Sequence, residues 1–501
     1  MPVKSNLFEA VKNSTNKTHT TNGLPANKST LSACVDLFAK GASFRRNPKM
    51  IRQLVREAYH EDKLICTRIL FYFRDIRGNS GQGERAIFRE ALKELIELDA
   101  NHVKNVLKFI PEYGRWDDLI NLWGISSATN KIIGETIEDQ LKKDLVALES
   151  GQVEKISLLA KWMPSSNTSS AKTKFLAKEI RTKVFGINEK IYRKTLSLLR
   201  KVLNLVETNL SQKNYSFDYS KLPGKAILQY RKAFLRNDEV RYKKYLDALN
   251  VAVRSGDTSV KVNASTVYPY ELVEKCWRAS TQEKSLCDSM WRSLKDYFNG
   301  NTANWLALAD VSGSMSGRPM AVSVSLATYI AERNHGIFKN KYITYSNNPR
   351  LIEIDPEWPL DKKIDYVMHE DVGYNTNLIK VFDVILNAAV ENRLEEGDMP
   401  EALVIISDMQ FDSHQMSGQD DRSIDIIKRK YAEAGYKLPK IVYWNVAQED
   451  YGNVPVTVRD ENTILVNGCK PGMFDMILQG ANPLDFVLRV VNSERYSQII
   501  F

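Results

Sequence analysis

The stretch from Asn304 to Ser316, NWLALADVSGSMS, constrains the fold more than any other part of the chain. Its apolar run, Trp305 to Ala309, has the length of a strand that is buried on both faces, as strands of parallel sheets are. The run ends abruptly at Asp310. Because residues i, i+2 and i+4 of an extended chain point to one side, Asp310, Ser312 and Ser314 would present a carboxylate and two hydroxyls together. Such oxygen ligands suit Mg²⁺ or Mn²⁺. The alternative is a polar turn in which a serine caps the next helix.

Short apolar runs alternate with amphipathic helical patterns from residue 300 onwards. The expected strands cover 305–309, 341–345, 351–354, 402–407, 441–445 and 463–466. The expected helices cover 319–333, 360–369, 378–392 and 423–434, with further helices near 473 and from 483. This alternation predicts an open, mostly parallel sheet with helices on both faces, which is a doubly wound α/β fold. In such sheets ligands gather at the carboxyl ends of the strands.

Two more polar residues are expected at this edge of the sheet. Asp408 directly follows the apolar run ALVIIS, and Thr376 lies in GYNTN, just before a helix. The series Asp310, Ser312, Ser314, Thr376 and Asp408 resembles the metal-ion-dependent adhesion site (MIDAS) of von Willebrand factor A domains, although GYNTN replaces the usual double glycine. The resemblance implies that these five residues hold a divalent cation, some through water. We expect Mg²⁺, with Mn²⁺ or Ca²⁺ as alternatives. It also implies a coordination position for a partner's carboxylate, and no catalysis.

Helical periodicity dominates the chain before residue 300. Apolar residues recur at three- and four-residue spacing in one stretch after another, from residue 50 to residue 250. Many helices joined by short connections predict helix pairs stacked as a HEAT-like solenoid. Residues 1–28, rich in Asn, Thr, Ser and Lys, are expected to form a flexible arm, with partial order against the body as the alternative. The expected domains are this arm, an all-α helical-repeat domain at 29–299 and the α/β domain at 300–501.

The charge of the chain is divided unevenly between these halves. The formal net charge is +9, but residues 300–501 hold 19 Lys and Arg against 28 Asp and Glu, so residues 1–299 carry about +18. Such an imbalance points to a polyanionic partner for the first half, and tyrosines interleaved with the cations favour a nucleic acid. The alternative is a solvated basic face without a specific partner. The candidate RNA-binding residues are Lys161, Lys172, Lys174, Arg181, Lys225, Arg231, Lys232, Arg236, Arg241, Lys243 and Lys244.

One glycine-rich stretch could be mistaken for a nucleotide-binding loop. Gly78, Gly81 and Gly83 lie between two expected helices, but no strand precedes them and no Gly-Lys-Ser/Thr follows. We therefore expect a structural corner between helices. The arginines around it, Arg74, Arg77, Arg85 and Arg89, are expected to pair with acids rather than to hold phosphates.

The combination of a basic helical half with an A-type domain resembles the Ro autoantigen family, whose helical part is the TROVE domain. The stretches RDIRGNSGQGER, YGRWDDL, LAKWMPS and YRKAFLRND look closer to an uncharacterised TROVE-like family of phages, giant viruses and plants. The resemblance implies that the helices close into a ring and that the protein is a non-enzymatic RNA-binding component of a ribonucleoprotein. Structured or misfolded small RNA would bind the basic helical surface.

Two further sequence features, the absence of long apolar runs and the placement of the cysteines, bear on the cellular location of the protein. No apolar run has the length of a transmembrane helix, and the five scattered cysteines suggest neither a disulfide framework nor a zinc knuckle. We expect a monomer in the cytoplasm that does not contact membranes. Two other functions compete with RNA binding. The first is a protein-interaction scaffold in which the metal captures an acidic side chain of a partner. The second is a metal-dependent nuclease, which the small number of clustered carboxylates disfavours.

Overall fold

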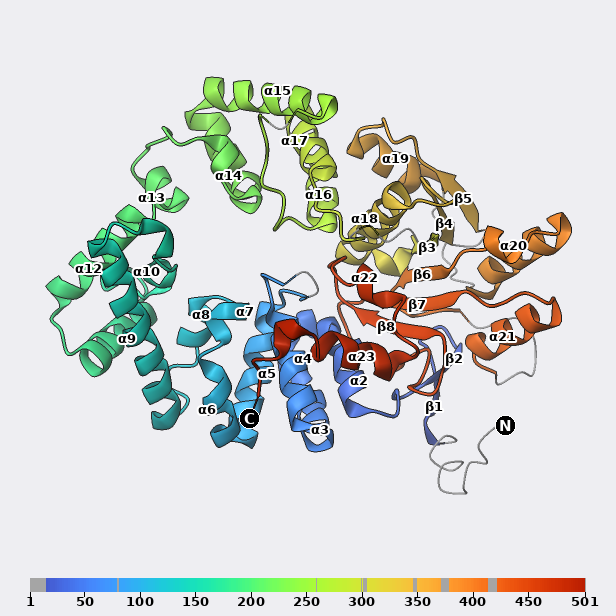
Figure 1. The fold of residues 1–501 in the computed structure, drawn as a ribbon, viewed down its shortest axis with the longest axis horizontal. Helices are drawn as coiled ribbons and strands as arrows, with labels where there is room; N and C mark the ends of the chain where they lie inside the picture. The colour runs from blue at the N-terminus through green and yellow to red at the C-terminus, as the bar shows by residue number, and fades with distance from the viewer. Residues whose placement is uncertain are drawn as a thin grey trace.

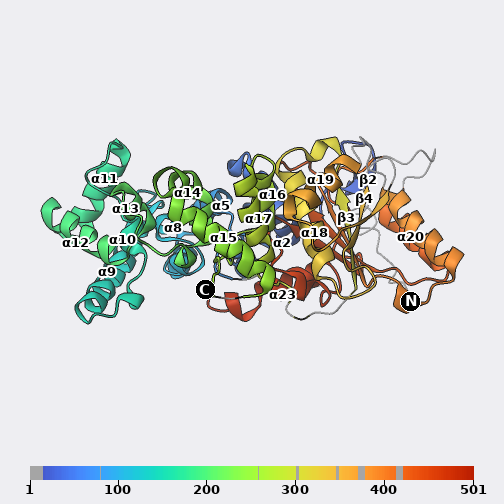
Figure 2. The same cartoon turned by 90° about the horizontal axis from the view of Figure 1, so that it is seen from above.

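The computed structural model describes residues 15–78, 81–257, 259–298, 300, 304–345, 349–370, 378–412 and 421–500. Helices form an arc that leaves a sheet-containing domain and returns to it (Figure 1). The same molecule seen edge-on is a flattened body (Figure 2). The fold class expected from the sequence, an all-α half followed by a mixed α/β domain, is confirmed.

Between residues 33 and 292, the described residues form sixteen α-helices. Several begin at a side chain that accepts a hydrogen bond from the first turn, such as Ser32, Asp62 and Asn188, which are favoured residues for that position. The helices are α2 (Ala33–Lys40), α3 (Ile51–Glu61), α4 (Lys63–Arg74), α5 (Arg85–Leu98), α6 (Ala100–Leu107), α7 (Ile110–Tyr113), α8 (Trp116–Ile120), α9 (Ser127–Glu149), α10 (Leu159–Trp162), α11 (Ala171–Ile180), α12 (Glu189–Val202), α13 (Val206–Ser211), α14 (Gly224–Asn237), α15 (Glu239–Ser255), α16 (Pro269–Cys276) and α17 (Thr281–Arg292).

The second half holds a six-stranded sheet in the order β5-β4-β3-β6-β7-β8, in which only the pair β4–β5 is antiparallel. The strands are β3 (Trp305–Asp310), β4 (Lys341–Tyr345), β5 (Arg350–Glu353), β6 (Ala402–Ser407), β7 (Lys440–Asn445) and β8 (Thr463–Asn467). The helices are α18 (Arg318–Arg333), α19 (Leu360–Glu370), α20 (Leu378–Asn392), α21 (Ser423–Glu433), α22 (Phe474–Ile477) and α23 (Pro483–Val491). This strand order is that of doubly wound sheets. From the boundary between β3 and β6, successive strands are added outwards in opposite directions, so this boundary is the switch point of the sheet.

Both ends of the helical arc pack against the sheet domain, so the elements close a ring. At one end α2 packs against β8 and α23, and at the other α16 packs against α18. The C-terminal segment secures the first contact. The Tyr113 hydroxyl donates to the carbonyl of Arg495 at 2.7 Å, and the Arg495 guanidinium pairs with the buried Asp75 carboxylate at 2.8 Å. The family resemblance implied that the helices close into a ring. In this structure the sheet domain forms one sector of that ring (Figure 1).

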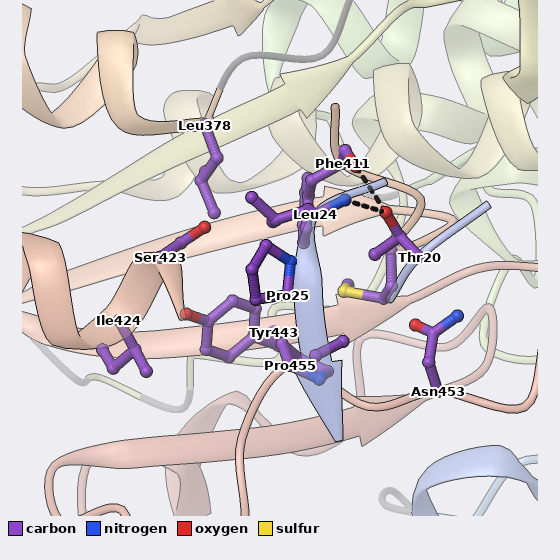
Figure 3. A pocket seen from close by; sticks show the side chains of 12 residues that line it. Thr20, Leu24, Pro25, Leu378, Phe411, Ser423, Ile424, Tyr443, Asn453 and Pro455 are labelled. Atoms are coloured by element: carbon purple, nitrogen blue, oxygen red, sulfur yellow. Dashed lines mark hydrogen bonds between the residues drawn. The ribbon is translucent and has the colours of Figure 1, made fainter. Parts of the chain in front are cut away.

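The expected flexible arm at 1–28 needs correction for residues 15–28. These residues form a hairpin of β1 (Lys17–His19) and β2 (Pro25–Asn27) that is docked on the sheet domain. The Thr20 hydroxyl donates to the carbonyl of Phe411 at 2.7 Å, and Leu24 is only 3% exposed. The void between hairpin and domain measures ≈ 10 Å³, about the room of a single water (Figure 3). For these residues the structure favours the alternative, order against the body, because the apolar Leu24 anchors the turn. Residues 1–14 lie outside the described ranges.

The sequence expectations on membranes and cysteines concern the whole chain. Within the described residues, no helix has the length and apolar character needed to cross a bilayer. All five cysteines are buried and free, as the sequence indicated.

Candidate metal site and nucleic-acid interface

The expected metal site lies where the strand order reverses. β3 and β6 are parallel neighbours, with Ala309 opposite Ile406, so both strands end at the same edge of the sheet. Asp310 is the last residue of β3, and Asp408 directly follows β6. Beyond β3 the chain turns through Gly317, whose φ of +88° places it in the left-handed region that favours glycine, and enters α18. The switch point is where doubly wound sheets hold their ligands.

Hydrogen bonds fix both carboxylates at this edge. The Ser407 hydroxyl donates to Asp310 Oδ2 at 2.6 Å, and the Ser312 N–H donates to Asp310 Oδ1 at 3.0 Å. The Gln410 N–H donates to Asp408 Oδ1 at 3.1 Å. Asp408 Oδ2 is buried and has no hydrogen-bond partner within the described part of the chain. An acceptor left without a donor in a buried position is costly unless a cation or water completes it.

Both carboxylates have a raised proton affinity, chiefly because they are buried. Burial, followed by the charge of Asp408, raises the pKa of Asp310 to about 7. Burial likewise raises the pKa of Asp408, while hydrogen bonds from Gln410 and Ser314 act in the opposite direction. Like charges in a dry site repel, and a bound cation would remove that penalty. The orphaned Asp408 oxygen and the nearby hydroxyls therefore fit a hard divalent cation.

Four of the five expected ligands meet at this edge. The hydroxyls of Ser312 and Ser314 lie 3.2 Å apart, beside the two aspartates. Thr376 lies outside the described residues. Among the residues that the structure describes, no group of three or more His, Cys, Asp and Glu side chains is placed to share a metal. The cluster is thus a mixture of carboxylates and hydroxyls, without the several carboxylates that metal nucleases commonly gather.

The eleven expected RNA-binding cations fall into three groups. Five are engaged in ion pairs, mostly with acids on other helices: Lys161 with Glu207, Lys225 with Glu271, Arg231 with Glu283, Arg241 with Asp238 and Lys243 with Glu239. Arg181 donates to the carbonyl of Ile187 at 3.3 Å. The remaining five, Lys172, Lys174, Lys232, Arg236 and Lys244, are exposed. Tyr242, expected among them as a stacking aromatic, is 1% exposed and packs against Phe234 in the core.

A basic surface on α12 was missed by the sequence reasoning. Four of its cations, Lys190, Arg193, Lys194 and Lys201, line a groove of ≈ 970 Å³. Within the described ranges none of the four forms an ion pair, and all are exposed. Their spacing of three, four and seven residues puts them on one face of the helix, while Tyr192, Leu196 and Leu199 form its buried face. The regular spacing of these four cations could be seen in the sequence.

The rest of the groove lining is mostly polar. Arg200 is held in place, because its guanidinium donates to the carbonyls of Ala160 and Met163 at 2.8 Å each. The other lining residues are mostly uncharged amides and hydroxyls: Ser165, Ser166, Asn167, Ser197, Asn204, Thr208, Asn209, Gln212 and Asn214. A single acid, Glu189, lines the groove. The groove therefore attracts anions.

The glycine-rich corner has the structural role that the sequence favoured. The Asp75 carboxylate accepts the backbone N–H groups of Arg77 and Gly78 at 2.9 and 2.8 Å. Arg74 and Asp118 form a buried pair at 2.7 Å, and Arg89 also pairs with Asp118. These ion pairs organise the corner, but two of the four arginines do not take part in them. Arg77 donates to the carbonyls of Pro111, Glu112 and Gly114. Arg85 is exposed and has no ion pair in the described structure.

Two family models match the chain. One, a domain of unknown function (DUF2828), matches residues 20–124 and 128–300, and the other, a domain of unknown function (DUF7788), matches residues 304–495. An uncharacterized protein of Acanthamoeba polyphaga mimivirus, L728, is 30% identical over 512 residues, covering 95% of this chain and 87% of that protein. The expected likeness to proteins of giant viruses is thereby confirmed.

A solved structure is also similar in its fold. The crystal structure of the Ro (RSR) protein of Deinococcus radiodurans matches 90% of this chain and 99% of that chain. The sequence identity is 14% and the TM-score is 0.49.

Proposed function

The chain belongs to the DUF2828 family, and from this premise we propose that it is an RNA-binding protein of Ro type that catalyses no reaction. It would take up structured or misfolded small RNA on the basic surface of its helical half. The divalent-metal site of the α/β domain would serve as a contact for a protein partner. We place the protein in a reducing cytoplasm, where its five buried, free cysteines would stay reduced, and we expect it to act as a monomer.

The observation that carries this proposal is the unpaired stripe on α12. Lys190, Arg193, Lys194 and Lys201 are exposed, line one groove and have no acid within ion-pair distance in the described ranges. Cations that are paired within the protein must exchange partners to bind a phosphate, whereas unpaired ones exchange only water and counterions. The same half of the chain carries a net charge of about +18, which would attract a polyanion over a distance.

The metal would be held by Asp310 and Asp408, with Ser312 and Ser314 and, by the motif, Thr376. When bound, it would supply a positive charge that neutralises the two buried carboxylates. Those carboxylates and the hydroxyls beside them keep the cation at the sheet edge, where it can accept an acidic side chain of a partner. The site offers no nucleophile and base pair among its described residues, so a binding role suits it better than a catalytic one.

The test is a titration of RNA against the purified protein at several salt concentrations. Four phosphate contacts on a single strand give a slope of about −3 in log affinity against log salt, since each contributes about −0.7. Affinity should therefore fall roughly 50-fold between about 50 and 200 mM salt. The double variant Lys190→Ala/Lys194→Ala should bind more weakly and with a slope shallower by about 1.4. The control Lys339→Ala/Lys437→Ala removes the same charge from the α/β domain and should bind as the natural protein does.

Three outcomes would contradict this proposal. Absence of RNA binding at low salt would end it. If a protein partner is captured with Mg²⁺, is lost with EDTA and with Asp310→Ala, and comes without RNA, the scaffold is the better description. Cleavage of RNA that requires Mg²⁺ and Asp310 would make the protein a nuclease.

A further inference from the structure

We propose that Lys470 makes the contact between the two ends of the helical arc sensitive to pH, so that this contact is firmer when the Lys470 amine is uncharged. The inference concerns how the ring is held closed, and it does not depend on the proposed RNA binding. Lys470 lies three positions beyond β8 and is only 4% exposed.

Three segments that are far apart in the sequence meet at Lys470. Its Nζ donates to the backbone carbonyl of Asp75, in the glycine-rich corner, at 3.3 Å. The same Nζ lies 4.6 Å from the centre of the Tyr268 ring, and Tyr268 directly precedes α16. A Cβ added to Gly83 would lie 3.3 Å from the Tyr268 hydroxyl oxygen and 3.4 Å from Lys470 Cε, so the three segments are in close contact. We call this contact of the corner, Tyr268 and Lys470 the arc joint.

A second lysine lies against the same aromatic ring. Lys225 of α14 places its Nζ 4.0 Å from the centre of the Tyr268 ring and pairs with the Glu271 carboxylate at 3.1 Å. Lys470 differs from Lys225, because it has no carboxylate within ion-pair distance in the described part of the chain. The charge of Lys225 is therefore compensated within the joint, whereas a charge on Lys470 would not be.

A buried ammonium without an acidic partner is unfavourable, because the protein does not replace its hydration. The single carbonyl of Asp75 accepts only one of the three N–H groups that a charged lysine carries. Burial lowers the pKa of Lys470 to about 7. The positive charges of Lys225 and Arg74 act in the same direction, whereas the negative charges of Asp75 and Glu84 oppose it. The geometry and the charges thus both favour the uncharged amine in the closed joint.

The other ionisable groups around Lys470 are accounted for. Burial raises the pKa of the neighbouring Cys469 thiol to about 11 and also raises the pKa of the Tyr268 hydroxyl, so both stay protonated at about pH 9. The four charged side chains that act on Lys470 all have ion-pair partners: Arg74 with Asp118, Asp75 with Arg495, Glu84 with Arg45 and Lys225 with Glu271. We therefore attribute the change of charge in the arc joint between about pH 7 and 9 to Lys470.

The direction of the pH effect follows from the two states of the joint. Opening would return Lys470 to water, where a lysine titrates near about 10.4. Between about pH 7 and 10 the open state therefore binds more protons than the closed state, and the closed joint gains stability as pH rises. The gain reaches at most about tenfold in the equilibrium constant per pH unit. Well below pH 7 both states are protonated, and stability no longer depends on this group.

Hydrogen exchange followed by mass spectrometry tests the joint in the full-length protein. The protection of the amides in α16 is measured at about pH 7, 8 and 9 and corrected for the intrinsic exchange rate at each pH. Lys470→Met replaces the amine by an uncharged chain of similar length, and Lys470→Arg keeps a charge throughout this range. Lys440→Met is the matched control. The pKa of Lys440 is also lowered by burial, but Lys440 begins β7, at the other end of the strands, and donates to the carbonyl of Gly480.

We expect the protection of α16 in the natural protein to rise about five- to tenfold per pH unit between about pH 7 and 9. Lys470→Met should be well protected already at about pH 7 and show no rise, because no charge is left in the buried position. Lys470→Arg should be poorly protected at every pH. Lys440→Met should behave as the natural protein does. A merely structural role of Lys470 would change the protection by the same factor at each pH.

The inference is overturned if the protection of α16 in the natural protein does not change over this range, or if the rise persists in Lys470→Met. A rise that is lost in Lys225→Met and kept in Lys470→Met would assign the proton to Lys225 and would also overturn it. Circular dichroism checks that each variant is folded, and Lys470→Gln, a second uncharged variant, takes the place of Lys470→Met if that protein does not fold. None of these outcomes bears on RNA binding, which the salt titration tests separately.

Discussion

The proposed metal site and the α12 groove differ in how the chain assembles them. Asp310 and Asp408 are 98 positions apart in the sequence, are almost fully buried and are brought together by the pairing of two parallel strands. The groove is formed by residues 165–214, mostly exposed, and its cations come from a single helix. The buried site depends on the correct fold of the whole domain, whereas the exposed groove depends on which face of one helix is left uncovered. The two sites should therefore respond to different perturbations.

The largest expected contrast is in the response to metal. Mg²⁺ at about 100 times its dissociation constant should add about 2.7 kcal/mol to the free energy of unfolding, since it binds only the folded site. Asp310→Asn should abolish most of this gain, because it removes a charged ligand from a buried position. Chemical denaturation with Mg²⁺ and with EDTA measures the effect. Glu357→Gln, an exposed residue of the same domain, should keep the full gain.

RNA affinity in the same variant shows whether the two sites are separate. Asp310→Asn and EDTA should leave both the affinity and the salt slope unchanged, since none of the groove residues belongs to the α/β domain. A loss of RNA affinity in parallel with the loss of metal would show that the ring transmits metal binding to the groove. The comparison would then describe one coupled site instead of two.

A second contrast is the pH dependence without metal. In the folded protein the pKa of Asp310 is about 7, because of burial and the neighbouring Asp408, whereas an unfolded aspartate titrates near 3.8. Between these values the folded state binds more protons than the unfolded state, so stability falls as pH rises. The fall should reach about 1.4 kcal/mol per pH unit between roughly pH 5 and 6.

Denaturation in EDTA across this pH range measures the slope. Asp310→Asn should flatten it, and Lys190→Ala/Lys194→Ala should leave it unchanged, because these lysines lie in the helical half, away from Asp310. A slope that persists in Asp310→Asn would assign the proton uptake to another group, with Asp408 the first to examine by Asp408→Asn.

The metal site and the groove also differ in what the sequence could reveal. A strand that ends on an acid, followed by alternating serines, predicted the position of Asp310, and the run ALVIIS predicted that of Asp408. Both predictions depended only on the rule that parallel strands end at a common edge. The fold class followed from the same alternation of strands and helices. Local patterns sufficed because buried strands have a distinctive composition.

Charge density was a weaker guide to the nucleic-acid surface. The cations between 221 and 244 drew attention by their number, yet Arg231 pairs with Glu283 and Lys225 with Glu271, which lie on other helices. A sequence does not show such long-range pairing, so it does not distinguish a free cation from a neutralised one. The row of cations on α12 could be recognised in the sequence from its spacing of three and four residues. Only the tertiary structure showed that this face is open and borders a groove.

A substitution in the N-terminal hairpin should have the smallest effect on stability. It tests whether the hairpin helps to position the proposed metal ligand Asp408. The Thr20 hydroxyl donates to the carbonyl of Phe411 at 2.7 Å and accepts the N–H of Leu24 at 2.9 Å, close behind Asp408. Thr20→Val keeps the shape but leaves both backbone groups unpaired in a buried position. It should lower the free energy of unfolding by about 1 kcal/mol. Thr21→Val, at an exposed neighbour, should have no effect.

The same variant should weaken Mg²⁺ binding slightly and leave RNA binding intact. Gln410, whose side chain accepts the N–H of Thr21 at 2.8 Å, also donates its own N–H to Asp408, so the hairpin restrains the loop that presents this carboxylate. Isothermal titration with Mg²⁺ would show a lower affinity for Thr20→Val than for Thr21→Val. Equal affinities would mean that the hairpin stabilises the domain without positioning the metal ligand. The strands alone would then account for the geometry of the buried site.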